Sequence, residues 1–379
     1  MPFEHYIPCG AGRLRCGYTT GTCAALAAAG AARLLLTGAA PKTMALTTPA
    51  GIPVEAELLD ARLDGGSACC AVRKDGGDDI DATDGLLVYA AVRKTAGGIT
   101  IDGGEGVGRV TAPGLDQPVG AAAINTTPRR MIAQAAAEQC RACGWGGGLA
   151  VTVSIPGGAE TAAGTFNPRL GILGGLSVLG TTGIVEPRSL RALLDTVEAE
   201  LKMYAAAGRT DLILTPGHYG EEFLRTLPGL DGVPVVQYAN FLGDSLDLAA
   251  RHGFRRVLVA GHLGKLVKAA GGIMDTHSRV ADCRMEILTA HAALCGAGQD
   301  CAAQVMAAVT TDQALEVLDR FGLREAVLHS LLPRLQDHLE HRAAGAFRVG
   351  AVVFNNVSGL LGATGPGAAL LKELGGIDL

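Results

Sequence analysis

A turn rich in glycine and threonine near the start of the chain contains the residue types of an anion-binding site. The segment 17–23 holds Thr19, Thr20 and Thr22 beside two glycines, and an Ala/Leu-rich helix is expected over 23–36. The first backbone N–H groups of a helix have no intrahelical partners, and the helix dipole favours an anion there. Thr20 or Thr22 can cap this helix or bind a ligand, so an ordinary capped helix and an anion site both remain open.

Histidine has the side chain whose pKa lies nearest to neutral pH, which suits a general base, and two histidines are candidates for that role. His277 lies between Asp275 and Arg279 near the start of an expected helix, and His262 follows an apolar run expected to form a strand. A lone histidine is more often structural than catalytic. The sequence therefore leaves both roles open for each of them.

Several sequence motifs fail on spacing. The segment 104–108 lacks the third glycine of a dinucleotide-binding turn, because Arg109 occupies that position. Lys265 does not belong to a phosphate-binding loop, because Leu266 replaces the serine or threonine that binds magnesium. The segment 275–291 contains metal-ligand residue types without a pair at metal-binding spacing, so no metal site is expected.

Two longer segments carry a resemblance to a known family. Residues 14–25 read LRCGYTTGTCAA, and residues 270–284 read AGGIMDTHSRVADCR. Through these blocks the chain resembles the cobalt-precorrin-5B C1-methyltransferase family of anaerobic cobalamin (vitamin B12) biosynthesis, over nearly its whole length. Further blocks that look like family segments are 74–85, 103–115, 123–125, 128–132, 165–172, 179–187, 240–247 and 261–268.

The resemblance implies a reaction and a methyl donor. A methyl group passes from S-adenosyl-L-methionine to C1 of cobalt-precorrin-5B and gives cobalt-precorrin-6A, with cobalt present only as part of the substrate. In such a transfer a substrate carbon is the nucleophile and a neutral thioether leaves. The protein then needs no nucleophilic side chain, metal or phosphate cradle, and its task is to orient the reactants in a dry pocket.

This chemistry suggests residues for each role. Glycine-lined turns let backbone N–H groups approach a cofactor, and basic or helix-terminal donors suit the carboxylates of a precorrin. If a proton moves at the ring, His277 or His262 is the expected catalytic base. The cofactor is expected at Gly180, Thr181, Thr182, Gly183, Gly217, Gly220 and Gly261. The substrate is expected at Thr19, Thr20, Thr22, Arg129, Arg169, Lys265 and Arg284.

Two other classes of protein remain open from the sequence. The strand–helix alternation of the second half also suits a nicotinamide-dependent reductase of a tetrapyrrole pathway, although the missing GxGxxG motif counts against it. Dispersed basic residues without a catalytic signature also suit a non-catalytic tetrapyrrole-binding protein. A small-molecule tetrapyrrole is the expected partner in each case, and the sequence leaves homo-oligomerisation open.

Composition and charge argue against several function classes. The 379 residues are 48% hydrophobic and 18% charged, and the net charge of −5 argues against a surface for nucleic acid or anionic membranes. No uninterrupted apolar run reaches the ~18 residues of a membrane span, and the N-terminus lacks the basic region of a signal peptide. The ten cysteines are then expected to be reduced thiols of a cytoplasmic protein.

The pattern of apolar residues predicts two domains. An α+β domain is expected over 1–157, and an α/β Rossmann-like domain with a mostly parallel sheet is expected over 158–379. Ligands of such a sheet bind beyond the carboxyl ends of its strands. Helices are expected over 23–36, 128–142, 218–227, 243–252, 262–270, 279–294, 312–320 and 323–342. Strands are expected over 43–48, 53–60, 67–74, 85–94, 98–102, 149–155, 211–214, 233–238, 256–260 and 349–354.

Overall fold

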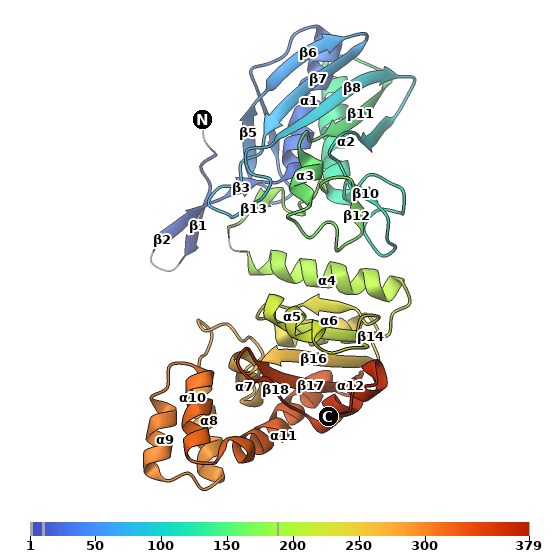
Figure 1. Ribbon diagram of the computed structural model, residues 1–379. Helices are drawn as coiled ribbons and strands as arrows, with labels where there is room; N and C mark the ends of the chain where they lie inside the picture. The colour runs from blue at the N-terminus through green and yellow to red at the C-terminus, as the bar shows by residue number, and fades with distance from the viewer. Residues whose placement is uncertain (1–2, 10–11, 188, 379) are drawn as a thin grey trace. The chain divides into compact units, whose positions relative to one another are not determined.

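The computed structural model describes residues 3–9, 12–187 and 189–378, and the chain forms two compact units, Met1–Leu190 and Arg191–Leu379 (Figure 1). The first unit contains β1 (Tyr6–Cys9), β2 (Gly12–Arg15), β3 (Gly17–Tyr18), α1 (Thr20–Thr37), β4 (Thr43–Thr47), β5 (Pro53–Glu57), β6 (Leu59–Asp64), β7 (Ser67–Arg73), β8 (Leu87–Thr95), β9 (Ile99–Gly103), β10 (Arg109–Val110), α2 (Thr126–Ala142), β11 (Gly148–Ser154), α3 (Gly158–Ala162), β12 (Ile172–Leu173) and β13 (Ile184–Val185).

The boundary between the units falls after Leu190, later than the break at 157 that the sequence suggested. The reason is that the segment after Gly158 returns to the first unit and pairs with it. Strand β12 pairs with β10, and β13 pairs antiparallel with β3 at the start of the chain. The Pro-Gly-Gly turn at 156–158 therefore ends a strand within the first unit, whereas the change of unit follows β13.

A mixed five-stranded sheet forms the centre of the first unit. Its strand order is β6-β7-β8-β11-β9, and every neighbouring pair is antiparallel except β11 with β9. Ala68, Cys70 and Val72 alternate along β7 and are fully buried in one core with residues of α1 and α2. A sheet with one face packed on helices gives this period of two. The mixed sheet agrees with the expected α+β organisation of this half.

Helix α1 is the central helix of the first unit. Its residues from Cys23 to Ala28 are fully buried, and their small side chains let the helix lie close to β7 and β8. By length and composition alone α1 could cross a membrane, but 78% of its apolar window is buried inside the unit, as in a core helix. Arg33 interrupts the apolar run of this helix.

The second unit alternates strands and helices around a sheet that is parallel except at one edge. Its elements are α4 (Leu190–Ala206), β14 (Asp211–Thr215), α5 (His218–Arg225), β15 (Val235–Gln237), α6 (Leu242–Arg251), β16 (Arg256–His262), α7 (Leu263–Ala270), α8 (Arg284–Leu294), α9 (Gln299–Met306), α10 (Thr311–Arg320), α11 (Arg324–Ala343), β17 (Arg348–Asn355), β18 (Gly359–Ala363) and α12 (Gly365–Gly375).

The strand order of this sheet is β15-β14-β16-β17-β18, and only β18 runs antiparallel to its neighbour. Leu212 and Leu214 pack with residues of α4, α6, α7 and α11, whereas Ile213 packs with residues of α5 and α12. Helices on both faces explain the continuous apolar runs of these strands. The mostly parallel sheet expected from the sequence is confirmed.

The order of the strands places a reversal in the middle of the sheet. From β14 the chain passes through α5 to β15 on one side, and from β15 it passes through α6 to β16 on the other side of β14. The crossovers therefore leave β14 and β16 in opposite directions. In open parallel sheets the crevice at such a reversal, outside the carboxyl ends of the strands, is where ligands bind.

Candidate active site

The threonine turn before α1 is filled by hydrogen bonds within the first unit. Thr19 caps the helix by accepting from the N–H of Thr22 at 3.3 Å. Thr22 Oγ1 donates to the Gly183 carbonyl at 2.7 Å, and Thr20 Oγ1 accepts from the N–H of Leu179 at 3.0 Å. The three threonines are at most 5% exposed. The polar groups that suggested an anion site are therefore engaged by the chain itself.

The predicted cofactor turn at 180–183 is the segment that engages them. A Cβ on Gly180 would lie 2.4 Å from Thr19 Oγ1, which leaves no room for a side chain. Gly180 and Gly183 also have positive φ angles of 129° and 83°, which favour glycine. Thr181 and Thr182 are exposed. The structure thus brings the predicted substrate threonines and one predicted cofactor turn together, and we call this packed contact the threonine clamp.

Arg129 was expected to bind a substrate carboxylate, but its guanidinium donates to three backbone carbonyls. The acceptors are Ile124 at 2.8 Å, Ile101 at 2.9 Å and Ala122 at 3.3 Å. Burial lowers the pKa of Arg129, and these carbonyls satisfy the donors that burial removes from water. Arg129 therefore ties α2 to the middle of β9 and to the segment 122–124. Arg169 is half-buried in the turn before β12.

The turns after β14 and β16 lie at the reversal of the second-unit sheet. Gly217 precedes α5, and a Cβ placed on it would meet no atom within 4 Å, so the backbone here borders open space. Gly220 and Gly261 pack instead against the side chains of Thr215 and Leu266. Thr215 Oγ1 is buried without a hydrogen-bond partner among the described residues. Of the three predicted cofactor glycines here, Gly217 therefore borders open space, whereas Gly220 and Gly261 allow close packing of neighbouring side chains.

The loop 271–283 folds over the start of α6 and reaches the same edge of the sheet. The N–H of Thr276 donates to the Asn240 carbonyl at 2.9 Å, and Gly243 donates to the Met274 carbonyl at 3.2 Å. Lys268 is 3% exposed and donates from Nζ to the Thr276 carbonyl at 3.2 Å. A buried ammonium group thus fixes the loop that carries His277.

Lys265 lies beside this loop with much of its hydrogen-bonding capacity unused. Its Nζ donates to the side-chain oxygen of Asn240, and a lysine ammonium has three donors. Burial lowers the pKa of Lys265, the positive charges of Lys268 and Arg284 lower it further, and Asp275 opposes them. A half-buried cation next to other cations is stabilised by an arriving anion. Lys265 is therefore suited to bind a carboxylate.

Both predicted catalytic histidines accept a backbone hydrogen bond at Nδ1. His262 Nδ1 accepts from the N–H of Gly264 at 3.1 Å, and His277 Nδ1 accepts from the N–H of Arg279 at 3.0 Å. A neutral imidazole that accepts at Nδ1 carries its proton on Nε2. Burial also lowers the pKa of His262, although Asp312 opposes this, so the neutral form dominates at neutral pH. In this geometry each ring presents a donor rather than a base.

Arg284, another predicted substrate residue, forms an ion pair at the end of the loop. Its Nε donates to Asp282 Oδ1 at 2.5 Å, and this contact raises the pKa of Arg284. The expected helix over 279–294 begins only at Arg284, because Cys283 adopts a left-handed conformation with φ of 52°. Within the part of the chain that the structure describes, no group of three His, Cys, Asp or Glu side chains could hold a metal ion.

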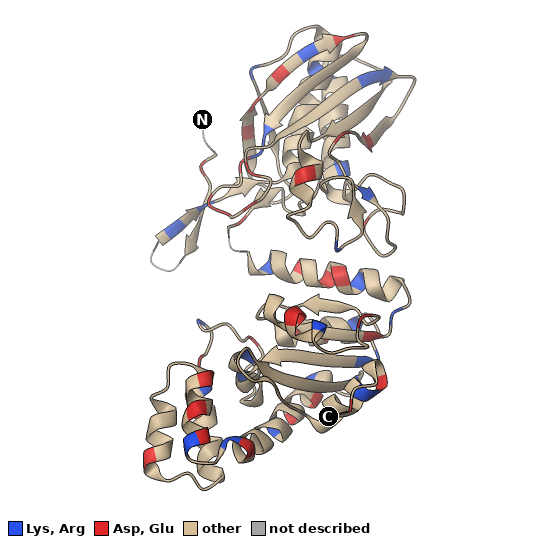
Figure 2. Ribbon diagram, in the orientation of Figure 1, with Lys and Arg blue, Asp and Glu red and all other residues tan. Residues whose placement is uncertain are grey.

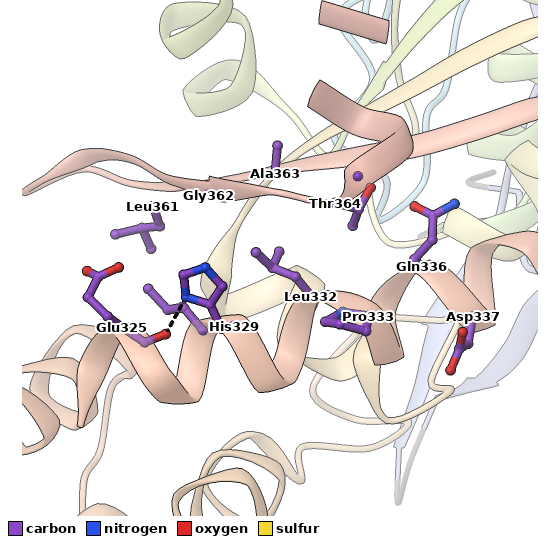
Figure 3. A pocket seen from close by; sticks show the side chains of 12 residues that line it. Glu325, His329, Leu332, Pro333, Gln336, Asp337, Leu361, Gly362, Ala363 and Thr364 are labelled. Atoms are coloured by element: carbon purple, nitrogen blue, oxygen red, sulfur yellow. Dashed lines mark hydrogen bonds between the residues drawn. The ribbon is translucent and has the colours of Figure 1, made fainter. Parts of the chain in front are cut away.

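Two cavities lie elsewhere in the molecule, and the smaller one does not suit a polycarboxylate ligand. It has a volume of about 590 Å³ and lies between α11 and β18 (Figure 3); Glu325, His329 and Asp337 contribute polar groups, and none of the described residues that line it is a lysine or arginine. A groove of about 1440 Å³ in the first unit is lined by the cations Arg15, Lys42, Arg73 and Lys74, of which Arg15 and Lys74 pair with acidic side chains of the 75–81 segment. Figure 2 shows basic and acidic residues interspersed over both units.

Three polar residues outside the predicted site residues lie at the carboxyl edge of the second-unit sheet. Asn240 follows β15, Asn355 ends β17, and Asp312 lies in the first turn of α10. The position of each asparagine after an expected apolar strand was a usable signal, because ligands bind beyond the carboxyl ends of parallel strands. Asp312 has no such signal, since only the packing of α10 brings it to this edge.

Comparisons with known proteins agree along almost the whole chain. A model of the CbiD family matches residues 8–187, and a model of the CbiD C-terminal domain matches residues 275–365. A curated relative from Ruminiclostridium cellulolyticum is 42% identical over 355 residues, which cover 94% of this chain and 92% of the relative. One from Edwardsiella ictaluri is 41% identical over 365 residues, with 95% of each chain covered. Both are named cobalt-precorrin-5B C(1)-methyltransferase.

A solved structure is also similar in sequence. It is a cobalamin biosynthesis protein (CbiD) from Archaeoglobus fulgidus, 30% identical, with 73% of this chain and 86% of that chain covered and a TM-score of 0.40. The two-unit chain described here belongs to the CbiD family. This is the family of the cobalt-precorrin-5B C1-methyltransferases, which are enzymes of cobalamin biosynthesis. Membership therefore excludes the two alternatives, a nicotinamide-dependent reductase and a non-catalytic tetrapyrrole-binding protein.

Proposed function

We propose that the protein transfers a methyl group from S-adenosyl-L-methionine to C1 of cobalt-precorrin-5B, and that the methyl donor binds at the carboxyl edge of the second-unit sheet. The observation that carries this location is the unused hydrogen-bonding capacity of Lys265 and His262 beside the reversal between β14 and β16. A Rossmann-like sheet binds its ligand at such a reversal. The polar groups of the threonine clamp, by contrast, are already engaged.

The residues at this edge fit the chemical groups of the methyl donor. S-adenosyl-L-methionine supplies an electrophilic methyl group, a carboxylate and a nucleoside. Lys265 suits the carboxylate, because its ammonium is half-buried among other cations. The space beside Gly217 gives the ligand access to backbone N–H groups at the start of α5. No side chain has to act as nucleophile, so the residues need only hold and orient the reactants.

Exposed apolar side chains at the same edge suit the faces of a macrocycle. Tyr219 is 66% exposed after β14, Val357 is 80% exposed after β17, and Val280 is 61% exposed in the 271–283 loop. The parallel strands end at one edge, so Tyr219 and Val357 follow strands on the same side. Apolar surface excludes water from a methyl transfer, and neighbouring Arg279 can pair with a substrate carboxylate. Arg284 and Arg169 stay proposed substrate contacts.

Amide hydrogen exchange with S-adenosylhomocysteine, the product of methyl transfer, tests the location. Exchange should slow in peptides covering 215–220 and 261–268 and stay unchanged over 179–183. NADPH should protect none of these peptides. Protection confined to 179–183 would show that the cofactor binds at the threonine clamp instead of the sheet edge. In parallel, the protein is incubated with a radiolabelled methyl donor and cobalt-precorrin-5B, and the label should appear in the macrocycle. A macrocycle without label would contradict the proposed methyl transfer.

A further inference from the structure

A polar wall stands at the ends of β16 and β17. His262 and Phe354 are partners in the register of these strands, and their rings meet edge to face with centroids 5.8 Å apart. Asn355 follows Phe354, and the first turn of α10 lies alongside, since a Cβ on Gly264 would come within 3.6 Å of Thr311 Oγ1. Three elements, β16, β17 and α10, therefore supply this wall.

Asn355 holds Asp312 in a fixed orientation within the wall. The Asn355 side chain is 3% exposed, its Nδ2 donates to Asp312 Oδ1 at 2.8 Å, and its Oδ1 accepts from the N–H of Ser358 at 2.7 Å. Both polar atoms of the amide are thus used. The second carboxylate oxygen of Asp312 accepts no hydrogen bond from the described residues, and Asp312 itself is half-buried.

His262 presents the complementary group. Its Nδ1 is occupied by the Gly264 N–H, so the proton of the neutral ring lies on Nε2. That nitrogen has no hydrogen-bond partner in the described part of the chain. The negative charge of Asp312 lies near enough to act on the His262 ring. A fixed N–H donor and a carboxylate acceptor therefore lie near each other at the carboxyl edge of the sheet.

We propose that Asp312 and His262 bind the ribose hydroxyls of a nucleoside bound at this edge of the sheet. This inference rests on the proposed methyl-donor site. A carboxylate that can accept from a hydroxyl, next to a neutral donor, matches a vicinal diol, and acidic side chains bind ribose hydroxyls at other sheet edges. The carboxylates of a precorrin do not suit this wall, because Asp312 would repel them. The wall therefore suits the nucleoside rather than the polyanionic substrate.

The test combines a change in the protein with a change in the ligand. Affinities for S-adenosylhomocysteine and for its 2′-deoxy and 3′-deoxy analogues are measured by calorimetry with the wild type and with Asp312→Asn. The substitution keeps the size of the side chain and its bond from Asn355 Nδ2. Glu316→Gln, on the exposed side of the same helix, is the matched control. Thermal unfolding of each variant verifies that it is folded.

Asp312→Asn should weaken binding of S-adenosylhomocysteine about 10- to 100-fold, since hydrogen bonds to charged groups are among the stronger ones. The wild type should bind at least one deoxy analogue more weakly than S-adenosylhomocysteine by a similar factor. For that analogue, Asp312→Asn should weaken binding by less than about a further 3-fold. Glu316→Gln should change affinity less than about 2-fold. If Asp312→Asn weakens binding of S-adenosylhomocysteine and of both deoxy analogues by the same factor, the proposal is overturned.

His262 gives a second readout. His262→Gln retains a side-chain N–H donor and should bind within about 5-fold of the wild type, whereas His262→Leu should lose about 10-fold or more. Equal affinities for both variants would remove His262 from the ribose contact. If the wild type itself fails to bind S-adenosylhomocysteine, the proposed methyl-donor site fails and this inference falls with it. Binding by the wild type without the coupling described would instead overturn the ribose contact alone.

Discussion

The threonine clamp and the carboxyl edge of the second-unit sheet look alike in sequence and differ in structure. Both combine glycine-rich turns with the start of a helix. In the clamp, Thr22 Oγ1 and the N–H groups before α1 find partners in the segment 179–183. At the sheet edge, Lys265 and His262 keep donors that no described residue of the chain accepts from. Unused donors, rather than residue types, distinguish the proposed binding site from the packed turn.

The difference follows from how each helix is covered. Residues of the first unit cover the start of α1, because β13 pairs with β3 directly before the helix and brings Gly183 to Thr22. In the second unit, α5 and α7 begin where parallel strands end, and a parallel sheet always gathers these helix starts along one edge. The first arrangement stabilises the fold, and the second leaves donors of Lys265 and His262 without acceptors among the described residues.

The largest expected effect comes from removing the cation at the sheet edge. Lys265→Met keeps the aliphatic length of the side chain and deletes its charge. We expect kcat/KM to fall about 100-fold, or ~2.7 kcal/mol, because a charge-assisted contact to a carboxylate is lost. The melting temperature should change little, since Lys265 contacts the rest of the chain through one amide oxygen. Steady-state kinetics and thermal unfolding measure both quantities.

The control is Lys202→Met on α4, where the lysine is exposed. It removes the same charge from the same unit and should leave kcat/KM within about 2-fold of the wild type, as surface substitutions generally do. If the two variants lose activity equally, the effect belongs to net charge, and Lys265 has no place in the site.

The comparison also indicates what the sequence could and could not predict. The expected helix over 128–142 and strand over 149–155 correspond to α2 and β11, because local periodicity determines them. The expected helix from 279 begins at 284, because Cys283 takes a left-handed conformation that no local pattern announced. Asp312 joins the sheet edge only through the packing of α10. Long-range pairing, such as β13 with β3, is what the sequence left undetermined.

A stability effect is expected from the threonine clamp. Thr22→Val keeps the shape of the side chain but removes one of the two donors to the buried Gly183 carbonyl, which keeps the N–H of Thr19. Losing one such hydrogen bond costs about 0.5–1.5 kcal/mol of unfolding free energy. Turnover per folded molecule should stay within about 3-fold, in contrast to the sequence-based hypothesis that these threonines bind substrate. Urea unfolding and kinetics on the same preparation distinguish the two.

The control for this prediction is Thr37→Val at the exposed end of α1, where the hydroxyl donates to the Arg33 carbonyl. It should lower stability by less than about 0.5 kcal/mol, as expected of a surface position. A large loss of kcat/KM in Thr22→Val with unchanged stability would show that the clamp is a substrate site after all.

A smaller effect is expected from His277. His277→Gln retains an N–H donor, and because the ring accepts at Nδ1 from Arg279, its role as a donor predicts less than about a 10-fold loss of turnover. A general base would instead cost about 10²–10⁴-fold and remove the acidic limb of the pH–rate profile. The full pH–rate profile of the variant decides between these roles, and a missing acidic limb would restore His277 as the base.

The smallest effect is a difference in how the units respond to mild acid. Burial lowers the pKa of His262 and of His291 in the second unit; Asp312 opposes the shift at His262, and Arg334 adds to it at His291. A histidine whose folded pKa lies below the unfolded value of ~6.5 takes up more protons when unfolded. Its stabilising contribution is therefore complete above pH ~6.5 and is lost as pH falls below it.

In the first unit the groups with a shifted pKa in the acid range are carboxylates. Burial raises the pKa of Asp75, but hydrogen bonds from Arg15 and Gly77 outweigh it and leave the pKa lowered, so this stability persists until pH falls below the unfolded value of ~3.9. Between pH 7 and 5 the urea midpoint followed by Trp145 fluorescence in the first unit should hardly change. The midpoint followed by circular dichroism, which reports both units, should fall, and His262→Gln/His291→Gln should abolish that fall. An equal fall at Trp145 that survives in the double variant would show that the acid response does not arise from these histidines.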